Sequence, residues 1–203
     1  ATRGVSHFKE ATRERFLSSE ELQRLGSALR LAETDGLPWD QETIKQSSKH
    51  LAKAANQRVV ISPYVTAAIR LLLFTGCRMR EILHLRWNEI DSERGLLLLP
   101  DSKTGKRAVV LNSAALSVLS TLERIDDYVI VSDKPGQPRS DLNRPWRRIR
   151  KHAGLDDVRI HDLRHSFASV GAGSGLGLPI VGKLLGHTQA QSKRPVRTAF
   201  RDS

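Results

Sequence analysis

Cysteine, tyrosine and long apolar runs are scarce in this 203-residue sequence. Cys77 is the one cysteine, so no disulfide can form within the chain, and we expect a cytoplasmic protein in a reducing compartment. No apolar run approaches the roughly 18 residues that a membrane-spanning helix needs. Residues 1–10 lack the apolar core of a signal peptide. The sequence therefore predicts no membrane association, and its first residue, which is not methionine, is typical of a fragment.

Positive charge is abundant. Lys and Arg number 33 against 22 Asp and Glu, which gives a net charge of +11 and a pI near 10.4. This balance favours a polyanionic partner, with nucleic acid as the leading candidate, although a basic protein that is merely soluble has the same balance. Hydrophobic residues make up 39% of the chain, enough for a core, and the length fits one large domain or two small ones.

Helix signals dominate the chain. Ser18–Glu21 has the capping-box pattern and predicts a helix to about Glu33, and Ser62-Pro63 predicts the start of an apolar helix that ends near Gly76. Five more helices are expected, the third of them basic: 78–85, 113–124 with Ser113 as its cap, 145–152 closed by Gly154, 161–170 and 179–185.

Strand signals are fewer. The apolar runs 96–100 and 107–111 flank a short polar turn and predict a β-hairpin, and 128–131 is also strand-like. The sequence thus predicts a mainly α fold with a small antiparallel β-sheet. We expect residues 1–17 to form a linker or arm, 18–191 one domain, and 192–203 an irregular tail.

Four separated motifs carry side chains suited to phosphate chemistry. An enzyme that attacks a DNA phosphodiester must neutralise the non-bridging oxygens, either with metal ions or with Arg, Lys and His. No carboxylate cluster has metal-ligand spacing, so we expect neither a metal nor a cofactor. The second solution is present in the segments Thr75–Glu81, Ser102–Lys106, His161–His165 and Leu185–His187.

Each motif taken alone has an ordinary explanation. Arg78 and Glu81 share a helix face at i, i+3, but so do the charges of any exposed helix start. His161 and Arg164 have the same spacing, which is common in surface pairs. A lysine in a turn is usually a solvated charge, and Gly186-His187 is typical of a helix C-terminus.

In this order the four motifs resemble the catalytic domain of the tyrosine recombinases, the phage-integrase family. The resemblance implies a DNA-breaking and -rejoining enzyme that forms a 3′-phosphotyrosyl intermediate, acts on double-stranded DNA and assembles as a tetramer on it. A type IB topoisomerase shares this chemistry. Family members usually carry a further N-terminal domain, so the sequence looks like the catalytic half alone.

The resemblance also implies residue roles. Arg78 and Arg164 clamp the phosphate, with Glu81 and Asp162 in support, and His161 is a general acid/base. Lys103 protonates the leaving 5′ oxygen, with Lys106 as the competitor, and His187 donates a hydrogen bond to the phosphate. DNA contacts are expected from four residues of the basic helix: Arg144, Arg147, Arg148 and Lys151.

The family's tyrosine nucleophile follows the last motif by about nine residues, and Val196 stands there. The only tyrosines, Tyr64 and Tyr128, precede that motif. Reading the degenerate codons from Ser192 one nucleotide later permits Ser-Ala-Arg-Tyr-Ala-Gln-Leu-Ser, with its tyrosine at this place. A reading-frame change, a deliberate alteration and natural loss all remain open. A recombinase domain and a cleavage-inactive DNA-binding relative or regulator are therefore both candidate functions.

Overall fold

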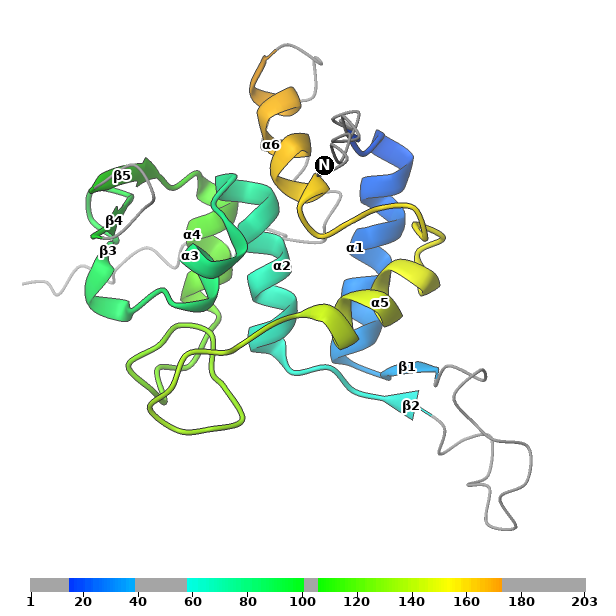
Figure 1. Cartoon of the computed structure of the whole chain (residues 1–203), viewed down its shortest axis with the longest axis horizontal. Coiled ribbons are helices and arrows are strands. Elements are labelled where there is room, and N and C mark those ends of the chain that lie inside the picture. The colour runs from blue at the N-terminus through cyan, green and yellow to red at the C-terminus, as the bar shows by residue number, and fades with distance from the viewer. Residues whose placement is uncertain (1–14, 39–57, 101–105, 173–203) are drawn as a thin grey trace, which may run out of the picture.

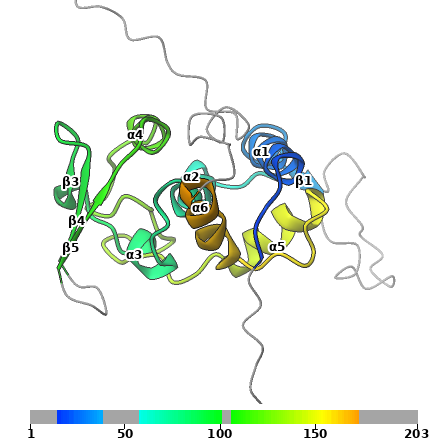
Figure 2. The same cartoon turned by 90° about the horizontal axis from the view of Figure 1, so that it is seen from above.

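The computed structural model describes residues 15–38, 58–100 and 106–172, with side chains as far as Phe167. Helix α2 (Pro63–Thr75) runs through the middle of the molecule. It packs against α1 (Ser19–Glu33), α4 (Ser113–Ser120) and α6 (Asp162–Ala172), as the two views of Figures 1 and 2 agree. Helix α5 (Asn143–His152) covers α1. Because α2 is surrounded, every side chain from Val65 to Thr75 is buried.

The two long N-terminal helices begin and end where the sequence predicts. Ser18 accepts a hydrogen bond from the Glu21 backbone N–H, and Glu21 accepts one from Ser18, so the capping box of α1 is confirmed. Pro63 occupies the first turn of α2, although the Ser62 side chain makes no capping hydrogen bond. Gly76 ends α2 with φ +61°, and its N–H donates to the Leu72 carbonyl.

One ion pair ties α1 to α2. Arg70 is 7% exposed on α2 and pairs with Glu33 at the end of α1, which also accepts a hydrogen bond from Thr66. A buried arginine without a partner would be costly, so this pair fixes the alignment of the two helices.

The predicted hairpin is confirmed. Strands β4 (Leu96–Leu99) and β5 (Arg107–Val110) pair antiparallel, with Leu99 opposite Arg107. The sequence analysis missed β3 (Ile90–Asp91), which pairs with β4 after the short 3-10 turn η3 (Trp87–Glu89). It also missed the two-residue pair of β1 (Leu37–Pro38) with β2 (Arg58–Val59). Two-residue strands carry too short an alternation to be recognised in a sequence.

Three expected elements differ in the structure. Residues 128–131 form no strand: Tyr128 makes an isolated bridge with Arg86, and the Val129 N–H donates to the Leu85 carbonyl. Helix α3 is limited to Met79–Leu83. Helix α4 is capped by Asn112 rather than by Ser113 and ends at Ser120. At 128–131 single hydrogen bonds stand in place of a strand, and in α4 the Asn112 side chain accepts the Ala115 backbone N–H.

The basic helix ending before Gly154, which has φ +64°, is confirmed as α5, and the helix expected over 161–170 is confirmed as α6. Arg15–Leu17, expected in the linker, contact the helical domain: Arg15 bonds Asp157, and the Leu17 N–H donates to Ser166. The expected helix 179–185 and tail 192–203 lie outside the described residues. Within the described part, no helix is long and apolar enough to cross a membrane.

Candidate active site

Arg78 lies at the bend between α2 and α3, where it precedes the first turn of α3. Its backbone N–H donates to Glu81 Oε2 at 2.7 Å, and its Nη1 donates to Glu81 Oε1 at 3.1 Å. The Glu81 side chain is 7% exposed, whereas that of Arg78 is 37% exposed. The carboxylate therefore holds the arginine from behind while part of the guanidinium remains open to a ligand.

A second arginine holds the same carboxylate. Arg107, the first residue of β5, donates from Nη2 to Glu81 Oε2 at 2.6 Å. Burial raises the pKa of Glu81, and the hydrogen bonds from the Arg78 backbone and the Arg107 guanidinium outweigh it, so the pKa lies below its ordinary value. Glu81 is therefore ionised at neutral pH and joins the start of α3 to the hairpin.

The first turn of α6 presents the third motif. Leu163 is fully buried, while His161 is exposed and Arg164 half-buried on the neighbouring face. The Asp162 carboxylate is buried and accepts the Arg159 backbone N–H at 2.7 Å, which stabilises the start of the helix. The His161 and His165 rings meet edge to face, with centroids 5.0 Å apart. Asp162 thus supports the helix that carries His161 and Arg164.

Helix α6 is packed directly onto the Gly76 bend. A Cβ built on Gly76 would lie 2.4 Å from Cδ1 of Phe167, so only glycine permits this approach. Cys77 follows immediately and is buried. Burial raises the pKa of its thiol, and the positive charges of Arg107 and Arg164 oppose that rise. Arg107 Nη2 lies 3.9 Å from Cys77 Sγ, and the approach of Phe167 to Gly76 brings the helix of the third motif onto the bend that carries the first.

Two further features describe this arginine cluster. Arg164 Nη1 is buried and has no hydrogen-bond partner among the described residues, so it can donate a hydrogen bond to an anionic oxygen. His161 is exposed, and the partial desolvation of its ring, with the nearby charges of His165 and Arg164, lowers its pKa below the ordinary value of 6.5, whereas Asp162 opposes this shift. At neutral pH the His161 imidazole is therefore mostly neutral and can donate or accept a proton.

The remaining predicted site residues are distributed as follows. Lys103, His187 and Val196 lie outside the described residues, and Lys106 is exposed at the edge of the described hairpin. On α5, Trp146 and Ile149 are buried on one face. The four basic residues, of which only Arg148 is half-buried, lie away from that buried pair: Arg144, Arg147, Arg148 and Lys151.

Sequence reasoning missed Arg107. On β5 the half-buried residues alternate with exposed ones, and Arg107 shares the inward positions with Val109. A charged residue at an inward position of a strand needs a partner, and this was the available signal.

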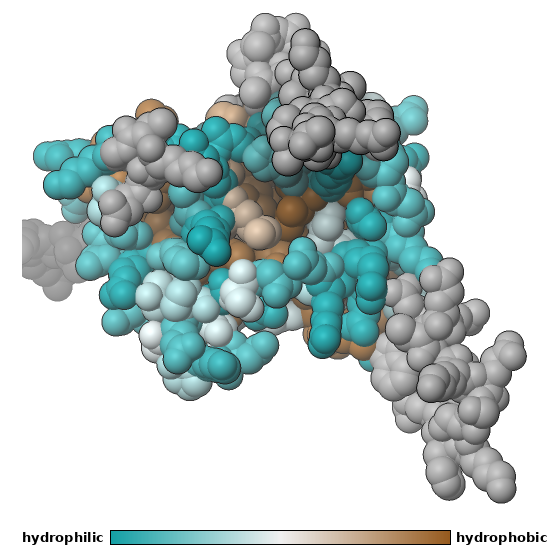
Figure 3. Space-filling view, viewed as in Figure 1, coloured by the Kyte–Doolittle hydropathy of each residue, from teal (hydrophilic) through white to brown (hydrophobic). Residues whose placement is uncertain are grey.

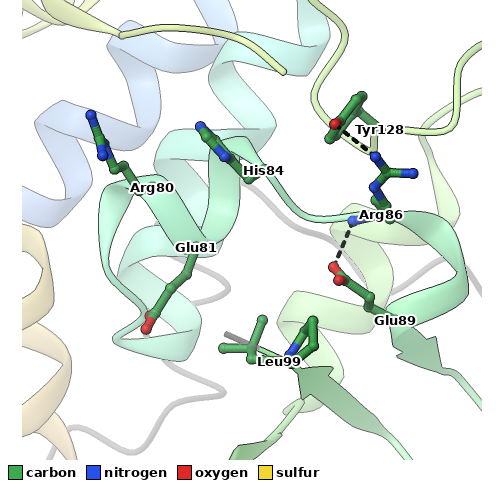
Figure 4. Close-up of a pocket in the computed structure, with 8 residues that line it drawn as sticks. Arg80, Glu81, His84, Arg86, Glu89, Leu99 and Tyr128 are labelled. Carbon is green, nitrogen blue, oxygen red and sulfur yellow. Dashed lines mark hydrogen bonds between the residues drawn. The ribbon is translucent and has the colours of Figure 1, made fainter. Parts of the chain in front are cut away.

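A groove of about 370 Å³ opens between α3 and the end of β4. Figure 4 shows Arg80 and His84 pointing away from Glu81, and Arg86 held between Tyr128 and Glu89. Arg86 Nη2 donates to the Tyr128 hydroxyl at 2.9 Å, and Glu89 accepts the Arg86 backbone N–H. Figure 3 shows that the face seen in Figure 1 is largely hydrophilic, with hydrophobic atoms exposed near its centre.

Comparisons with known proteins agree with this geometry. The Phage integrase family model matches residues 42–194, and the chain belongs to this family. The integrase of Salmonella phage P22 is 31% identical over 136 residues, which are 59% of this chain and 35% of that protein. Tyrosine recombinase XerA of Thermococcus onnurineus is 34% identical over 131 residues, 59% of this chain and 46% of that protein. The chain thus spans less than half the length of either relative.

Solved structures show the same fold. XerA recombinase gives a TM-score of 0.53 at 21% identity, over 90% of this chain and 58% of that chain. XerH site-specific recombinase bound to its difH substrate gives 0.54 at 24% identity, over 85% and 46%. The helical fold with its small antiparallel sheet is therefore that of the tyrosine recombinase catalytic domains.

Proposed function

We propose that this chain is the catalytic domain of a site-specific DNA recombinase, from a family that breaks and rejoins DNA through a 3′-phosphotyrosyl intermediate, and that it binds double-stranded DNA and assembles as a tetramer on it. The observation that carries the proposal is the close packing of α6, the helix of Arg164, on the Gly76 bend that precedes Arg78, whose guanidinium Glu81 holds. Two guanidinium groups on one side of a phosphate supply the charge-assisted hydrogen bonds that a pentacoordinate phosphorus needs. Arg164 Nη1, which has no hydrogen-bond partner among the described residues, can donate to a non-bridging oxygen.

The other proposed roles are those of proton donors and acceptors. Cleavage transfers a proton to the departing 5′ oxygen. We assign the role of proton donor to Lys103. His161, mostly neutral at pH 7, accepts the proton of the attacking hydroxyl or hydrogen-bonds the phosphate, and His187 donates a further hydrogen bond. Basic residues of α5 bind the DNA backbone on either side of the cleaved phosphate. We place the protein with DNA in the cytoplasm of a bacterium or of a phage-infected cell.

We further propose that the polypeptide in its present sequence forms no covalent DNA adduct. Val196 has no nucleophilic atom, and the family match ends at residue 194, before the position where the tyrosine is expected. The second candidate function is that of a DNA-binding but cleavage-inactive relative or regulator. The valine at position 196 favours this candidate. In both candidate functions the arginines bind a DNA phosphate.

A nicked suicide substrate tests these proposals. The protein is incubated with a library of nicked duplexes, and adducts are detected on a denaturing gel. We expect none from the unmodified chain, and an adduct once the residues from Lys193 onward are replaced by Ser-Ala-Arg-Tyr-Ala-Gln-Leu-Ser. Val196→Tyr alone should do less, since Pro195 restricts its neighbours and removes a backbone donor.

The control is the same replacement combined with Arg164→Gln, which should bind DNA yet form no adduct. An adduct from the unmodified chain would contradict the loss of the nucleophile. A folded, DNA-binding restored chain that stays inactive would favour the regulator.

A further inference from the structure

A second group of basic side chains lines the groove between α3 and the end of β4. Arg80 and His84 are one helical turn apart on α3, and Figure 4 shows them projecting from the same side of it. Arg86 lines the groove from the segment that follows α3. All three side chains are exposed. The groove therefore presents two guanidinium groups and an imidazole to solvent.

The hydrogen-bond donors of this groove are largely unused within the described part of the chain. The side chains of Arg80 and His84 make no hydrogen bond or ion pair with a described residue. Arg86 Nη2 donates to the Tyr128 hydroxyl at 2.9 Å, and the guanidinium carbon lies 4.7 Å from the centre of the Tyr128 ring. Because the hydroxyl oxygen accepts this bond, the Tyr128 O–H can donate to a further acceptor.

The carboxylates near the groove are already engaged. Glu81 receives two arginine side chains that lie outside the groove, and Glu89 accepts the Arg86 backbone N–H at 2.9 Å. Asp126, which is near Arg86 but does not line the groove, accepts two backbone N–H groups. The positive charge of Arg80 is therefore available to an anion from solvent.

The groove is also close to the phosphate that Arg78 is proposed to bind. His84 stands six residues after Arg78, which places it roughly 9 Å further along α3 at about 1.5 Å per residue. Duplex DNA advances about 3.4 Å along its axis for each phosphate of one strand. A strand that contacts Arg78 and follows α3 would therefore bring a phosphate about two or three positions away to the groove.

We propose that this groove is a second phosphate site, in which Arg80, His84 and Arg86 hold the DNA backbone beside the phosphate that Arg78 binds. The proposal rests on the proposed function, because its occupant is duplex DNA. Guanidinium groups form charge-assisted hydrogen bonds with a phosphodiester oxygen, and the imidazole N–H adds another. Contacts to the backbone carry no base information, so the groove adds affinity and fixes the position of the strand.

The salt dependence of duplex binding tests this on the unmodified chain, because the readout needs no nucleophile. Fluorescence anisotropy measures the binding constant K of a labelled duplex of random sequence at several salt concentrations. One phosphate contact contributes about 0.9 to the slope of log K against log salt, so Arg80→Gln combined with Arg86→Gln should lower the slope by about one. Arg80→Gln alone should lower it in part, and Arg80→Lys should leave it nearly unchanged.

The His84 ring reports whether the groove is occupied. In an NMR spectrum of the histidine ring protons, duplex DNA should move the His84 signal of the unmodified chain, and should move it much less in the double variant. His84→Asn assigns the signal. If the double variant fails to fold, Arg80→Gln carries the test, with thermal unfolding as the check, since the Arg80 side chain contacts no described partner.

Arg94→Gln is the matched control. Arg94 is an exposed arginine in the turn between β3 and β4, and it pairs with Asp91. It does not line the groove, so its loss should change neither the salt slope nor the His84 signal.

The outcomes separate the two proposals. An unchanged slope in the folded variants, or a His84 signal that bound DNA does not move, would overturn the second phosphate site and leave the proposed function standing. An equal fall of the slope in Arg94→Gln would show a general effect of net charge and would also overturn it. An unmodified chain that does not bind duplex DNA would overturn the proposed function, and the second phosphate site with it.

Discussion

Replacing Gly76 by alanine tests the packing that brings α6 to the α2–α3 bend. Gly76 has φ +61°, a conformation that costs an L-residue about 1–2 kcal/mol. The added Cβ would also lie 2.4 Å from Cδ1 and 3.1 Å from Cγ of Phe167, and such overpacking costs a further 1–3 kcal/mol or so. We therefore expect Gly76→Ala to lower the free energy of unfolding by roughly 2–5 kcal/mol.

Gly154→Ala provides the matched control. Gly154 has φ +64°, but nothing lies within 4 Å of a Cβ built on it. The variant should therefore lose only the cost of the left-handed backbone conformation, about 1–2 kcal/mol of unfolding free energy. Urea denaturation followed by circular dichroism measures both variants. Gly76→Ala combined with Phe167→Leu should recover part of the difference. Equal losses in the two single variants would refute the close packing of α6 on the bend that precedes Arg78.

Three further predictions concern charge. Glu81→Gln should destabilise the protein by about 1–3 kcal/mol at pH 7. Because the folded pKa of Glu81 is lowered, the stabilisation that its carboxylate provides is present above the ordinary pKa of 4.5 and is lost as the pH falls. The variant should therefore show a smaller loss of stability at acid pH when the urea midpoint is measured against pH. An unchanged profile would contradict this. In an NMR titration His161 should titrate below 6.5, and His165→Asn should raise its pKa by removing a positive neighbour; no change would argue against their contact. Arg144→Gln should weaken DNA binding and reduce the slope of log K against log salt by about one; binding insensitive to salt would argue against phosphate contacts.

Local features were predictable from the sequence because they depend on hydrogen bonds between near neighbours. The Ser18–Glu21 capping box, the Gly76 helix end and the basic helix α5 each satisfy their backbone groups within a few residues. The hairpin was predictable for a similar reason, since two apolar runs flank one polar turn. Residues 128–131 show the limit: an apolar run predicted a strand, but the neighbouring segment offers only single hydrogen bonds.

The candidate site was predicted only in part. Motif spacing placed Arg78 with Glu81 and His161 with Arg164, because i, i+3 pairs share a face whatever the fold. The sequence by itself thus determined the helices, the hairpin and the chemical identity of the phosphate-binding side chains.

Only the tertiary structure decided how these pieces meet. Arg107 contacts Glu81, which lies 26 positions earlier in the sequence. Phe167 packs on Gly76 from helix α6, which is also distant in the sequence. Such contacts depend on burial and on the approach of separate elements, and no local pattern encodes them. The resulting junction, in which one buried carboxylate receives two arginines beside a third, exists because α2, α3, α6 and β5 pack around the same bend.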